Sequence, residues 1–361
     1  MSYSKKELCY IWLSVAGGIS PTKREKLFAL VEDVCDLYDS LESLEEDIVA
    51  SVGKETYLRL LSAKEEDAAL REVEALDRLG AVALTEESEH WLPILSELAQ
   101  PPLVLYAKGD VRLLSNPCIA VVGTRAPTRY GRDVTESFVA DLATNGFTIV
   151  SGLARGVDTI AHRVALQYEK PTVGVMPCGL DRIYPAENKE LYEEIGRHGL
   201  LLTEYPLGTG VQQFTFVERN RLIAALAKGV LVTEAGEKSG SSITVNHALE
   251  QGKDVFAVPG NIYSKTSMGT NKLLKDMQGA LVTSAMDILE SYHVAVDPGP
   301  VCELQLDIIE SQIMEALEDG DKHIEELLAL TGMTVSQIGA ILTKLELMGL
   351  IHKLNGNYYG V

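Results

Sequence analysis

The feature that most constrains this fold is a series of short apolar runs between residues 116 and 290, most of them separated by helical patterns. The runs occupy residues 118–123, 147–153, 172–179, 200–206, 229–235, 254–260 and 279–283. Strands buried on both faces have such continuous apolar stretches, and the helical patterns supply the crossover connections of a parallel sheet. We therefore predict an α/β fold with an extended Rossmann-like, doubly wound sheet, which binds ligands beyond the carboxyl ends of its strands.

The segment before this region has a different pattern. Residues 1–95 have apolar residues at helical spacing, with helices expected at 7–17, 22–41 and 54–80, which predicts a small helical domain of the SAM or helix-hairpin-helix type. The turn at 17–23 (GGISPTK) weakly resembles a helix-hairpin-helix turn, whose backbone amides hold a phosphate. A plain helical turn is the simpler interpretation.

The segment after it predicts a third domain. We expect the sheet domain to span residues 96–295 and a linker at DPGP, followed by three helices and a hairpin in residues 301–361. Three helices and a hairpin are typical of a winged helix. Its third helix offers only Ser336, Gln337 and Lys344, so we favour a protein-contact or spacer role over sequence-specific DNA reading.

The charge distribution indicates where a nucleic acid could bind. The net charge of −20 is unfavourable for such a partner, but residues 1–115 hold 12 basic and 22 acidic side chains, residues 116–290 hold 17 and 19, and residues 291–361 hold 3 and 11. Because the middle region is nearly balanced, we expect any basic groove there.

Other features exclude several protein classes. The five cysteines (Cys9, Cys35, Cys118, Cys178 and Cys302) form no CxxC pair and have no nearby histidine cluster, so we expect no metal site, no disulfide and no cofactor. No run of about 18 apolar residues occurs, and the first residues lack a signal-peptide pattern, so we expect a cytoplasmic protein without membrane contact.

Two loops that follow predicted strands combine glycine with arginine. The first contains Gly123 and Arg125, and the second contains Ser151, Gly152, Arg155 and Gly156. Each precedes a helix, so free backbone amides and a partial positive charge favour a phosphate there. Each loop alone is equally typical of an ordinary strand-to-helix turn. The first does not match GxGxxG, which argues against a dinucleotide-binding dehydrogenase.

Two further segments suggest contacts with a nucleic acid. Phe214 and Phe216 precede Arg219, Asn220 and Arg221, a combination of stacking and phosphate-binding groups that single-strand binders use. A core role for the phenylalanines and ion pairs for the arginines are the alternative. Near the end of another strand lie four residues that would give a helix start donors and a cation: Lys238, Ser239, Gly240 and Ser241. Several such sites on one sheet edge fit a polyanion better than one small ligand.

These segments, with others in the same order, resemble the DprA (Smf) family of DNA-processing proteins. The motifs are GTRAPTRYG, SGLARGVDTIAH, CGLDRIYPAEN, TEYPLGTG, FVERNRLIAALA, EAGEKSGSSIT, DVFAVPGN and GTNKLLKDMQGA, within residues 100–290. The resemblance implies a non-enzymatic homodimer, joined through its Rossmann-like domain. It further implies binding of single-stranded DNA with little sequence preference and delivery of the strand to RecA during natural transformation and homologous recombination.

The chain departs from the family pattern in places. Val217 stands where a proline is common, Ala227 where a serine is common, and Gln212 and Gln213 where basic residues often occur. DNA binding would then depend more on three lysines: Lys189, Lys238 and Lys253. The main alternative is an enzyme resembling nucleoside-monophosphate phosphoribohydrolases, with Glu234 as its acid, although the PGGxGT loop of that group is missing.

Overall fold

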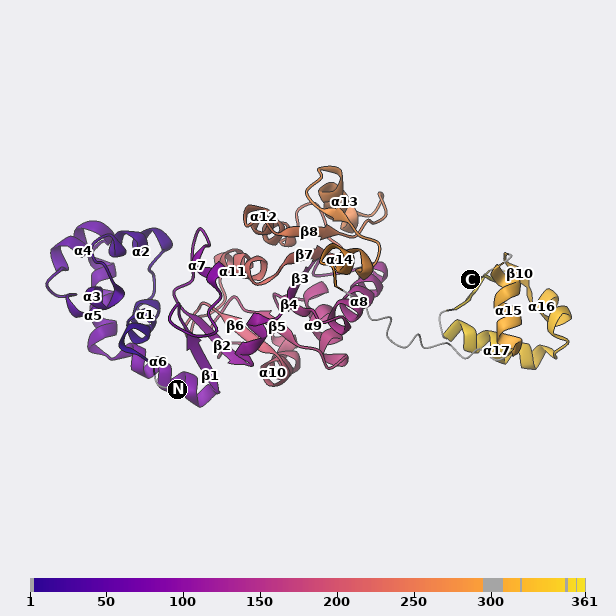
Figure 1. Ribbon diagram of the computed structural model, residues 1–361, viewed down its shortest axis with the longest axis horizontal. Helices are drawn as coiled ribbons and strands as arrows, with labels where there is room; N and C mark the ends of the chain where they lie inside the picture. Colours follow the sequence, from indigo (N-terminus) through magenta and orange to yellow (C-terminus); the bar gives the residue numbers. More distant parts are fainter. Residues whose placement is uncertain (1–2, 295–307, 319, 348–349, 355, 361) are drawn as a thin grey trace. The chain divides into compact units, whose positions relative to one another are not determined.

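The seven predicted apolar runs form seven of the strands of one nine-stranded sheet (Figure 1), whose order is β1-β2-β6-β5-β4-β3-β7-β8-β9. The seven strands from β6 to β9 in this order are parallel to one another. At the edge beside β6, β2 pairs antiparallel with β6, and β1 pairs antiparallel with β2. This confirms the predicted doubly wound sheet. The strands are β1 (Ala81–Leu84), β2 (Leu105–Gly109), β3 (Cys118–Val122), β4 (Thr148–Ser151), β5 (Thr172–Val175), β6 (Leu200–Thr203), β7 (Gly229–Val232), β8 (Asp254–Ala257) and β9 (Ala280–Leu281).

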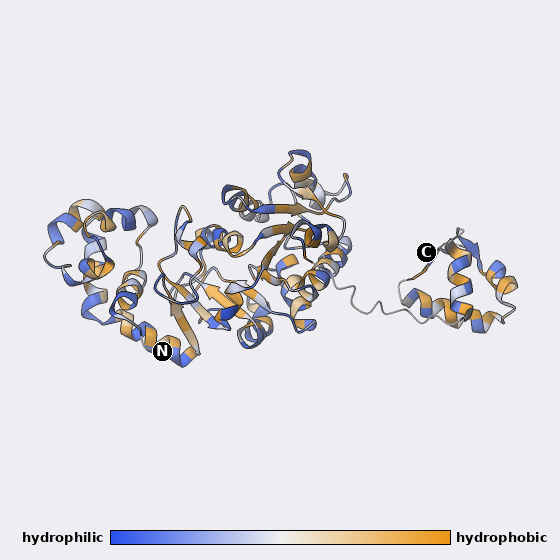
Figure 2. Ribbon diagram, in the orientation of Figure 1, coloured by the Kyte–Doolittle hydropathy of each residue, from blue (hydrophilic) through white to orange (hydrophobic). Residues whose placement is uncertain are grey.

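The structure is a computed structural model, and it describes residues 3–294, 308–318, 320–347, 350–354 and 356–360. Helices cover both faces of the sheet, and the strands between them are mostly apolar (Figure 2). One face carries α8 (Arg129–Thr144), α9 (Val157–Gln167), α10 (Lys189–His198) and α14 (Ala285–Ser291). The other carries α7 (Pro93–Ser96), α11 (Gln213–Leu226) and α12 (Ser241–Glu250), while α13 (Met268–Lys275) follows β8.

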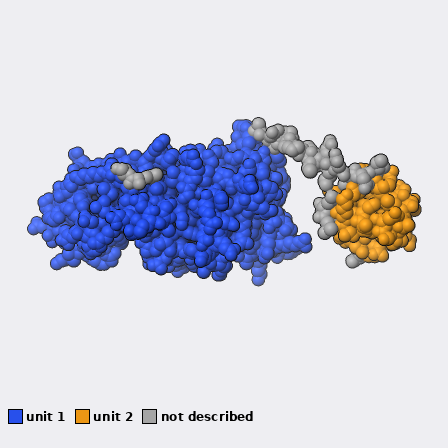
Figure 3. Space-filling model, turned by 90° about the horizontal axis from the view of Figure 1, so that it is seen from below, with its two compact units in different colours: residues 1–295 blue, residues 296–361 orange. Residues whose placement is uncertain are grey.

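The chain divides into two compact units, Met1–Ala295 and Val296–Val361 (Figure 3). The second unit contains α15 (Ile308–Glu318), β10 (Lys322–His323), α16 (Ile324–Thr331), α17 (Val335–Leu347), β11 (His352–Lys353) and β12 (Tyr358–Gly360). Its helices and small sheet enclose an apolar core that includes Ile313, Leu327 and Leu342, which confirms the predicted winged helix. The predicted start of its first helix at 304–307 lies outside the described residues.

No single helix among the described residues has the length and apolar composition needed to cross a membrane, although the bent pair of α16 and α17 passes that test jointly.

The N-terminal region is helical, as predicted, but its helices are shorter than expected. It contains α1 (Lys5–Val15), α2 (Pro21–Phe28), α3 (Val34–Asp39), α4 (Glu45–Val52), α5 (Lys54–Glu65) and α6 (Ala68–Leu79). The single helix predicted at 22–41 is wrong, because the chain leaves the helix after Phe28 and restarts at Asp33, whose carboxylate accepts from the Cys35 amide at 2.7 Å. The single helix predicted at 54–80 is wrong as well, because Asp67 adopts a left-handed conformation with φ +51° and separates α5 from α6. Apolar residues keep helical spacing across the break, which hides it from the sequence pattern.

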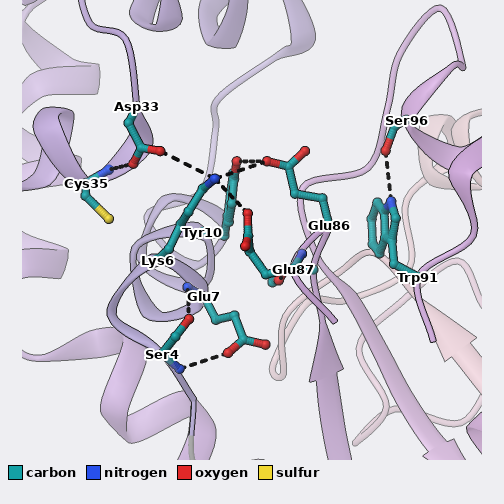
Figure 4. A network of polar contacts seen from close by, with 11 residues as sticks. Ser4, Lys6, Glu7, Tyr10, Asp33, Cys35, Glu86, Glu87, Trp91 and Ser96 are labelled. Carbon is teal, nitrogen blue, oxygen red and sulfur yellow. Dashed lines mark hydrogen bonds and ion pairs between the residues drawn. The ribbon is translucent and has the colours of Figure 1, made fainter. Parts of the chain in front are cut away.

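This helical region is joined to the sheet rather than separate from it. The prediction missed β1, which pairs with β2, so the sheet begins before residue 96. The backbone amide of Ala83 in β1 donates to the Tyr3 hydroxyl at 2.8 Å, and the amide of Thr85, just after β1, donates to Ser88 Oγ at 3.0 Å. A polar network ties α1 to the segment after β1 (Figure 4), in which Lys6 Nζ lies 2.6 Å from a Glu87 oxygen.

Candidate functional site

A groove lies where the strand order reverses. The strands β4, β5 and β6 lie on one side of β3, and β7, β8 and β9 lie on the other, so the loops after β3 and β7 diverge and leave a crevice. This switch-point groove has a volume of about 570 Å³. Eight of the predicted site residues line it: Gly123, Arg125, Phe216, Arg219, Asn220, Ser239, Gly240 and Ser241.

The exposed part of the groove combines a cation with aromatic rings. The guanidinium of Arg125 lies over the Phe216 ring, 5.5 Å from its centroid. The Tyr184 ring meets Phe216 edge-on, with centroids 5.3 Å apart. A guanidinium beside an aromatic face suits a nucleotide, because one group binds phosphate and the other stacks on a base.

The first two turns of α11 build one wall. Gln213, Phe216, Val217 and Asn220 line the groove, and their spacing puts them on one face of the helix. Gln213 and Val217 were not predicted as site residues, nor was Tyr184. Helical periodicity from Phe216 would have found the first two, whereas the contact of Tyr184 with Phe216 spans 32 residues of sequence and has no local signal.

Arg219 is a buried cation rather than an open phosphate-binding group. Only 3% of its surface is exposed, and its Nη1 donates to the carbonyl oxygens of Gly152, at 2.7 Å, and of Val175. Burial lowers the pKa of Arg219 to about 10, so it stays charged at neutral pH. The guanidinium thus joins the ends of β4 and β5, and its predicted contact with DNA would have to compete with these bonds.

Asp158 lies beneath the same loop. Its carboxylate accepts from the backbone amides of Gly152 at 3.1 Å and Ala154 at 3.3 Å. Burial raises its pKa, and the nearby charge of Arg219 opposes that rise. The acid and the arginine therefore hold the loop after β4 in shape.

The polar side chains of that loop are bonded to other parts of the protein and do not line the groove. Ser151 is fully buried, and its hydroxyl donates to the Val121 carbonyl at 2.6 Å, so it is not free to bind a phosphate. Arg155 pairs with Glu187 instead of lining the groove. Gly156 has φ +77°, and a Cβ there would lie 2.4 Å from the Thr124 carbonyl oxygen. The loop after β4 therefore packs directly against the loop after β3 at Gly156.

Three further predicted residues lie outside the groove. Phe214 and Arg221 are on the opposite face of α11 and line a different cavity, where Arg221 pairs with Glu204. Lys238 is exposed but does not line the groove. Of the other lysines considered, Lys253 precedes β8 and so lies at the amino-end rim of the sheet, away from the groove.

Glu234 does not have the surroundings expected of an exposed catalytic acid. It is buried, and its carboxylate accepts from the Thr128 amide at 2.8 Å, the Thr128 hydroxyl at 2.9 Å and the Thr266 hydroxyl at 2.6 Å. These bonds join the loops after β3 and β8. The Glu234 carboxylate is therefore occupied by the protein itself.

His162 is a fully buried, packed histidine. Its Nδ1 lies 2.7 Å from Thr172 Oγ1, and burial lowers its pKa to about 3. Within the described part of the chain, no three His, Cys, Asp or Glu side chains are grouped closely enough to hold a metal ion. The four described cysteines are free thiols, and Cys302 lies outside the described residues.

Comparisons with known proteins agree with this architecture. The sequence matches the family described as DNA recombination-mediator protein A over residues 82–293, and the DprA winged helix domain over residues 300–357. It is 45% identical to DNA processing protein DprA of Streptococcus pneumoniae over 55% of this chain and 70% of that protein. It is 34% identical to Protein Smf of Escherichia coli over 76% of this chain and 78% of that one. The match to DprA of Bacillus subtilis, at 44% identity, spans 54% of this chain and 66% of that protein.

Solved structures give the same result. The structure of DprA from Streptococcus pneumoniae has a TM-score of 0.68 and 34% identity, covering 80% of this chain and 98% of that one. The structure of DNA processing protein A from Helicobacter pylori, described for its single-stranded DNA binding mode, has a TM-score of 0.54 and 36% identity, covering 59% and 95%. The chain therefore belongs to the DprA (Smf) family of DNA-processing proteins.

Proposed function

We propose that this protein binds single-stranded DNA in the switch-point groove. The observation that carries the proposal is the guanidinium of Arg125 over the Phe216 ring, at the carboxyl edge of the parallel strands. A base stacks on the aromatic face while the neighbouring phosphate meets the cation. The Helicobacter pylori relative, described for its single-stranded DNA binding mode, supports this assignment.

The opposite wall of the groove suits the backbone of a nucleic acid. Gly240 is the N-cap of α12, and Ser239 and Ser241 flank it. Ser241 donates to Ser239 Oγ through both its amide and its hydroxyl, so the Ser239 hydroxyl is the donor that this helix start can offer to an anion. Stacking and phosphate contacts do not read the edges of bases. We therefore propose binding with little sequence preference.

We further propose that the protein delivers the bound strand to RecA during DNA uptake and homologous recombination. Membership of the DprA family supports this role. The winged helix is assigned to protein contact or spacing, because Lys344 of α17 is paired with Glu310 of the same unit and Gln337 accepts from the Thr334 amide and hydroxyl.

We propose that the active form is a homodimer joined through the sheet domain. Large apolar side chains are exposed in the segment from the loop after β8 to α14, which includes β9, the last strand of the sheet: Ile262, Tyr263, Met277, Leu281 and Met286. Exposed large apolar side chains near an open sheet edge suit an interface between proteins. A Met277→Asp variant is expected to sediment as a monomer.

A hydrolytic function is the weaker candidate. The Glu234 carboxylate accepts three hydrogen bonds from threonines and does not line the groove. We therefore propose a binding protein without catalytic turnover. Incubation with nucleoside monophosphates tests this, and release of free base would contradict it.

The DNA-binding proposal is tested by comparing a single-stranded oligonucleotide with its duplex across a range of salt concentrations. Because phosphate contacts release counterions, we expect affinity to fall steeply with salt. The Arg125→Ala/Phe216→Ala variant should lose roughly ten- to hundredfold in single-strand affinity, since one stacked base alone contributes about 1–3 kcal/mol.

The matched control is Arg197→Ala. Arg197 is an exposed arginine in the last turn of α10, at the opposite rim of the sheet. The Arg197→Ala variant loses one positive charge, as Arg125→Ala does, and its affinity for single-stranded DNA should be nearly unchanged. Equal affinity of the wild type and the double variant at moderate salt would overturn the proposal.

A further inference from the structure

A second cavity of about 570 Å³ lies between the helical region and the sheet, on the other side of α11 from the groove. Its lining includes three arginines, Arg24, Arg59 and Arg221, together with Glu204, Glu218 and Phe214. We infer that this arginine pocket binds a phosphate group, either of the DNA strand as it leaves the groove or of a free nucleotide. The DNA source rests on the proposed function, whereas phosphate binding itself does not.

Arg221 has buried donors that the protein does not use. Its side chain is 11% exposed and pairs with Glu204 through Nη2, but within the described residues its Nε and Nη1 are buried without a hydrogen-bond partner. A buried donor left unsatisfied costs about 1–3 kcal/mol. Ligand oxygens that accept from each of these nitrogens would remove that cost.

Arg24 brings a second guanidinium to the same place. It lies in the first turn of α2, and in the described structure no hydrogen bond or ion pair engages its guanidinium. Burial, and then the neighbouring charge of Arg221, lower the pKa of Arg24, so the two cations are close enough to repel each other. A dianion between them would replace that repulsion with attraction.

The third arginine stands over a glycine turn. A Cβ on Gly18 would lie 2.2 Å from Nη1 of Arg59, so the guanidinium rests against the backbone of that turn. Gly17 and Gly18 both have φ +66°, and Arg59 also pairs with Glu55 at 2.7 Å. The turn that weakly resembled a helix-hairpin-helix thus forms part of the pocket wall.

Two carboxylates oppose these charges without cancelling them. Glu218 accepts from the Tyr205 hydroxyl at 2.8 Å, and Glu204 pairs with Arg221. Burial raises the pKa of Glu204, which favours its neutral form. Arg221 pairs with Glu204, and Arg59 pairs with Glu55 from outside the pocket lining, so Arg24 is the lining arginine that has no ion pair among the described residues.

The position of Phe214 connects the two sites. Phe214, Glu218 and Arg221 lie on one face of α11, while Phe216 and Asn220 lie on the groove face. The Phe214 side chain is 52% exposed. A strand passing the start of α11 would stack on both rings and reach the arginine pocket with a following phosphate.

The test compares Arg24→Gln with Lys26→Gln. Lys26 is an exposed residue of the same helix that lines neither cavity. The probes are oligothymidylates of about 6 and about 20 nucleotides, a range chosen around known single-strand site sizes, together with thymidine monophosphate and inorganic phosphate. If the DNA supplies the phosphate, Arg24→Gln should weaken binding of the longer strand about three- to tenfold and lower its salt slope by about 0.7, with no change for the short strand.

A free nucleotide gives a different result. Thymidine monophosphate or inorganic phosphate would then raise the melting temperature of the wild type and of Lys26→Gln but not of Arg24→Gln. Binding of both oligonucleotides would be the same for all three proteins. Arg59→Gln repeats every measurement with a side chain that is 48% exposed, in case Arg24→Gln folds poorly.

The proposal is overturned if Arg24→Gln and Arg59→Gln match the wild type with all four probes. Failure of the proposed function would look different. In that case the wild type would bind neither oligonucleotide, and the thermal shifts with monophosphate and phosphate would still decide whether the arginine pocket binds an anion.

Discussion

The loops after β3 and β4 contain similar residue types but differ in which of their donors are already bonded. Both follow a buried strand, both contain glycine and arginine, and both lead into a helix. In the first, Arg125 is exposed beside Phe216. In the second, Ser151 and Arg155 bind other parts of the protein. The difference is that the donors of the second loop already have acceptors, and only the first loop keeps a free cation for a ligand.

The largest effect that tests this comparison is on stability. Arg219→Ala removes the donors to the Gly152 and Val175 carbonyls and leaves the buried Asp158 without its neighbouring cation. We expect a loss of about 3–5 kcal/mol in the free energy of unfolding, measured with a chemical denaturant. Arg125→Ala is the control and should stay within about 0.5 kcal/mol of wild type. Normal stability with lost DNA affinity would identify Arg219 as a direct contact instead.

A smaller effect should link the two loops. Gly156→Ala adds a Cβ that would lie 2.4 Å from the Thr124 carbonyl, in a residue with φ +77°. We expect a loss of about 1–3 kcal/mol in stability together with weaker single-strand binding, because the loop carrying Arg125 must shift. Gly146→Ala shares the positive φ, at +92°, but has no atom within 4 Å of the added Cβ. Gly146→Ala should therefore lose stability without losing single-strand affinity. Equal single-strand affinity of the two variants would argue against the idea that the loop after β4 positions the loop after β3.

Ser151→Ala should have a modest effect that is confined to stability. The substitution removes the hydrogen bond to the Val121 carbonyl, which contributes about 0.5–1.5 kcal/mol. Single-strand affinity should not change, because the hydroxyl has no exposed surface. Thermal unfolding and gel shift together separate the two readouts. Weaker binding at unchanged stability would mean that this serine reaches the DNA after all.

The smallest effect is expected at Arg155. Its pair with Glu187 is largely exposed, and such pairs contribute about 0–1 kcal/mol. Arg155→Gln should therefore change neither the melting temperature nor the slope of affinity against salt by a measurable amount. If it lowers affinity as much as Arg125→Ala does, both loops bind the strand and the contrast between them fails.

The parallel sheet was predictable because its strands are buried on both faces. Each predicted run from 118–123 to 279–283 contains the corresponding strand. In contrast, β1 is a four-residue strand that directly follows α6, so Gly80 is its only sequence signal. The helix boundaries of the N-terminal region were harder to predict, because packing and not local propensity decides where each helix ends.

The site was predictable only in part, for a related reason. Glycine and arginine near strand ends indicated the correct rim, and Gly123, Arg125, Phe216 and Asn220 do meet there. Which polar groups remain free depends on partners distant in sequence. Ser151 bonds a carbonyl 30 residues away, Arg155 a carboxylate 32 residues away, and Arg221 one 17 residues away. No local pattern contains that information.

The two margins of the sheet have a consequence for assembly. The Tyr3 hydroxyl accepts from the Ala83 amide of β1, and Ser88 Oγ accepts from the Thr85 amide just after this strand, while β9 ends the other margin with exposed residues. A sheet edge whose backbone amides are already bonded is a poor template for a further strand. A homodimer formed through two β9 margins would use up both open edges, so it would close as a pair and would not propagate into a filament.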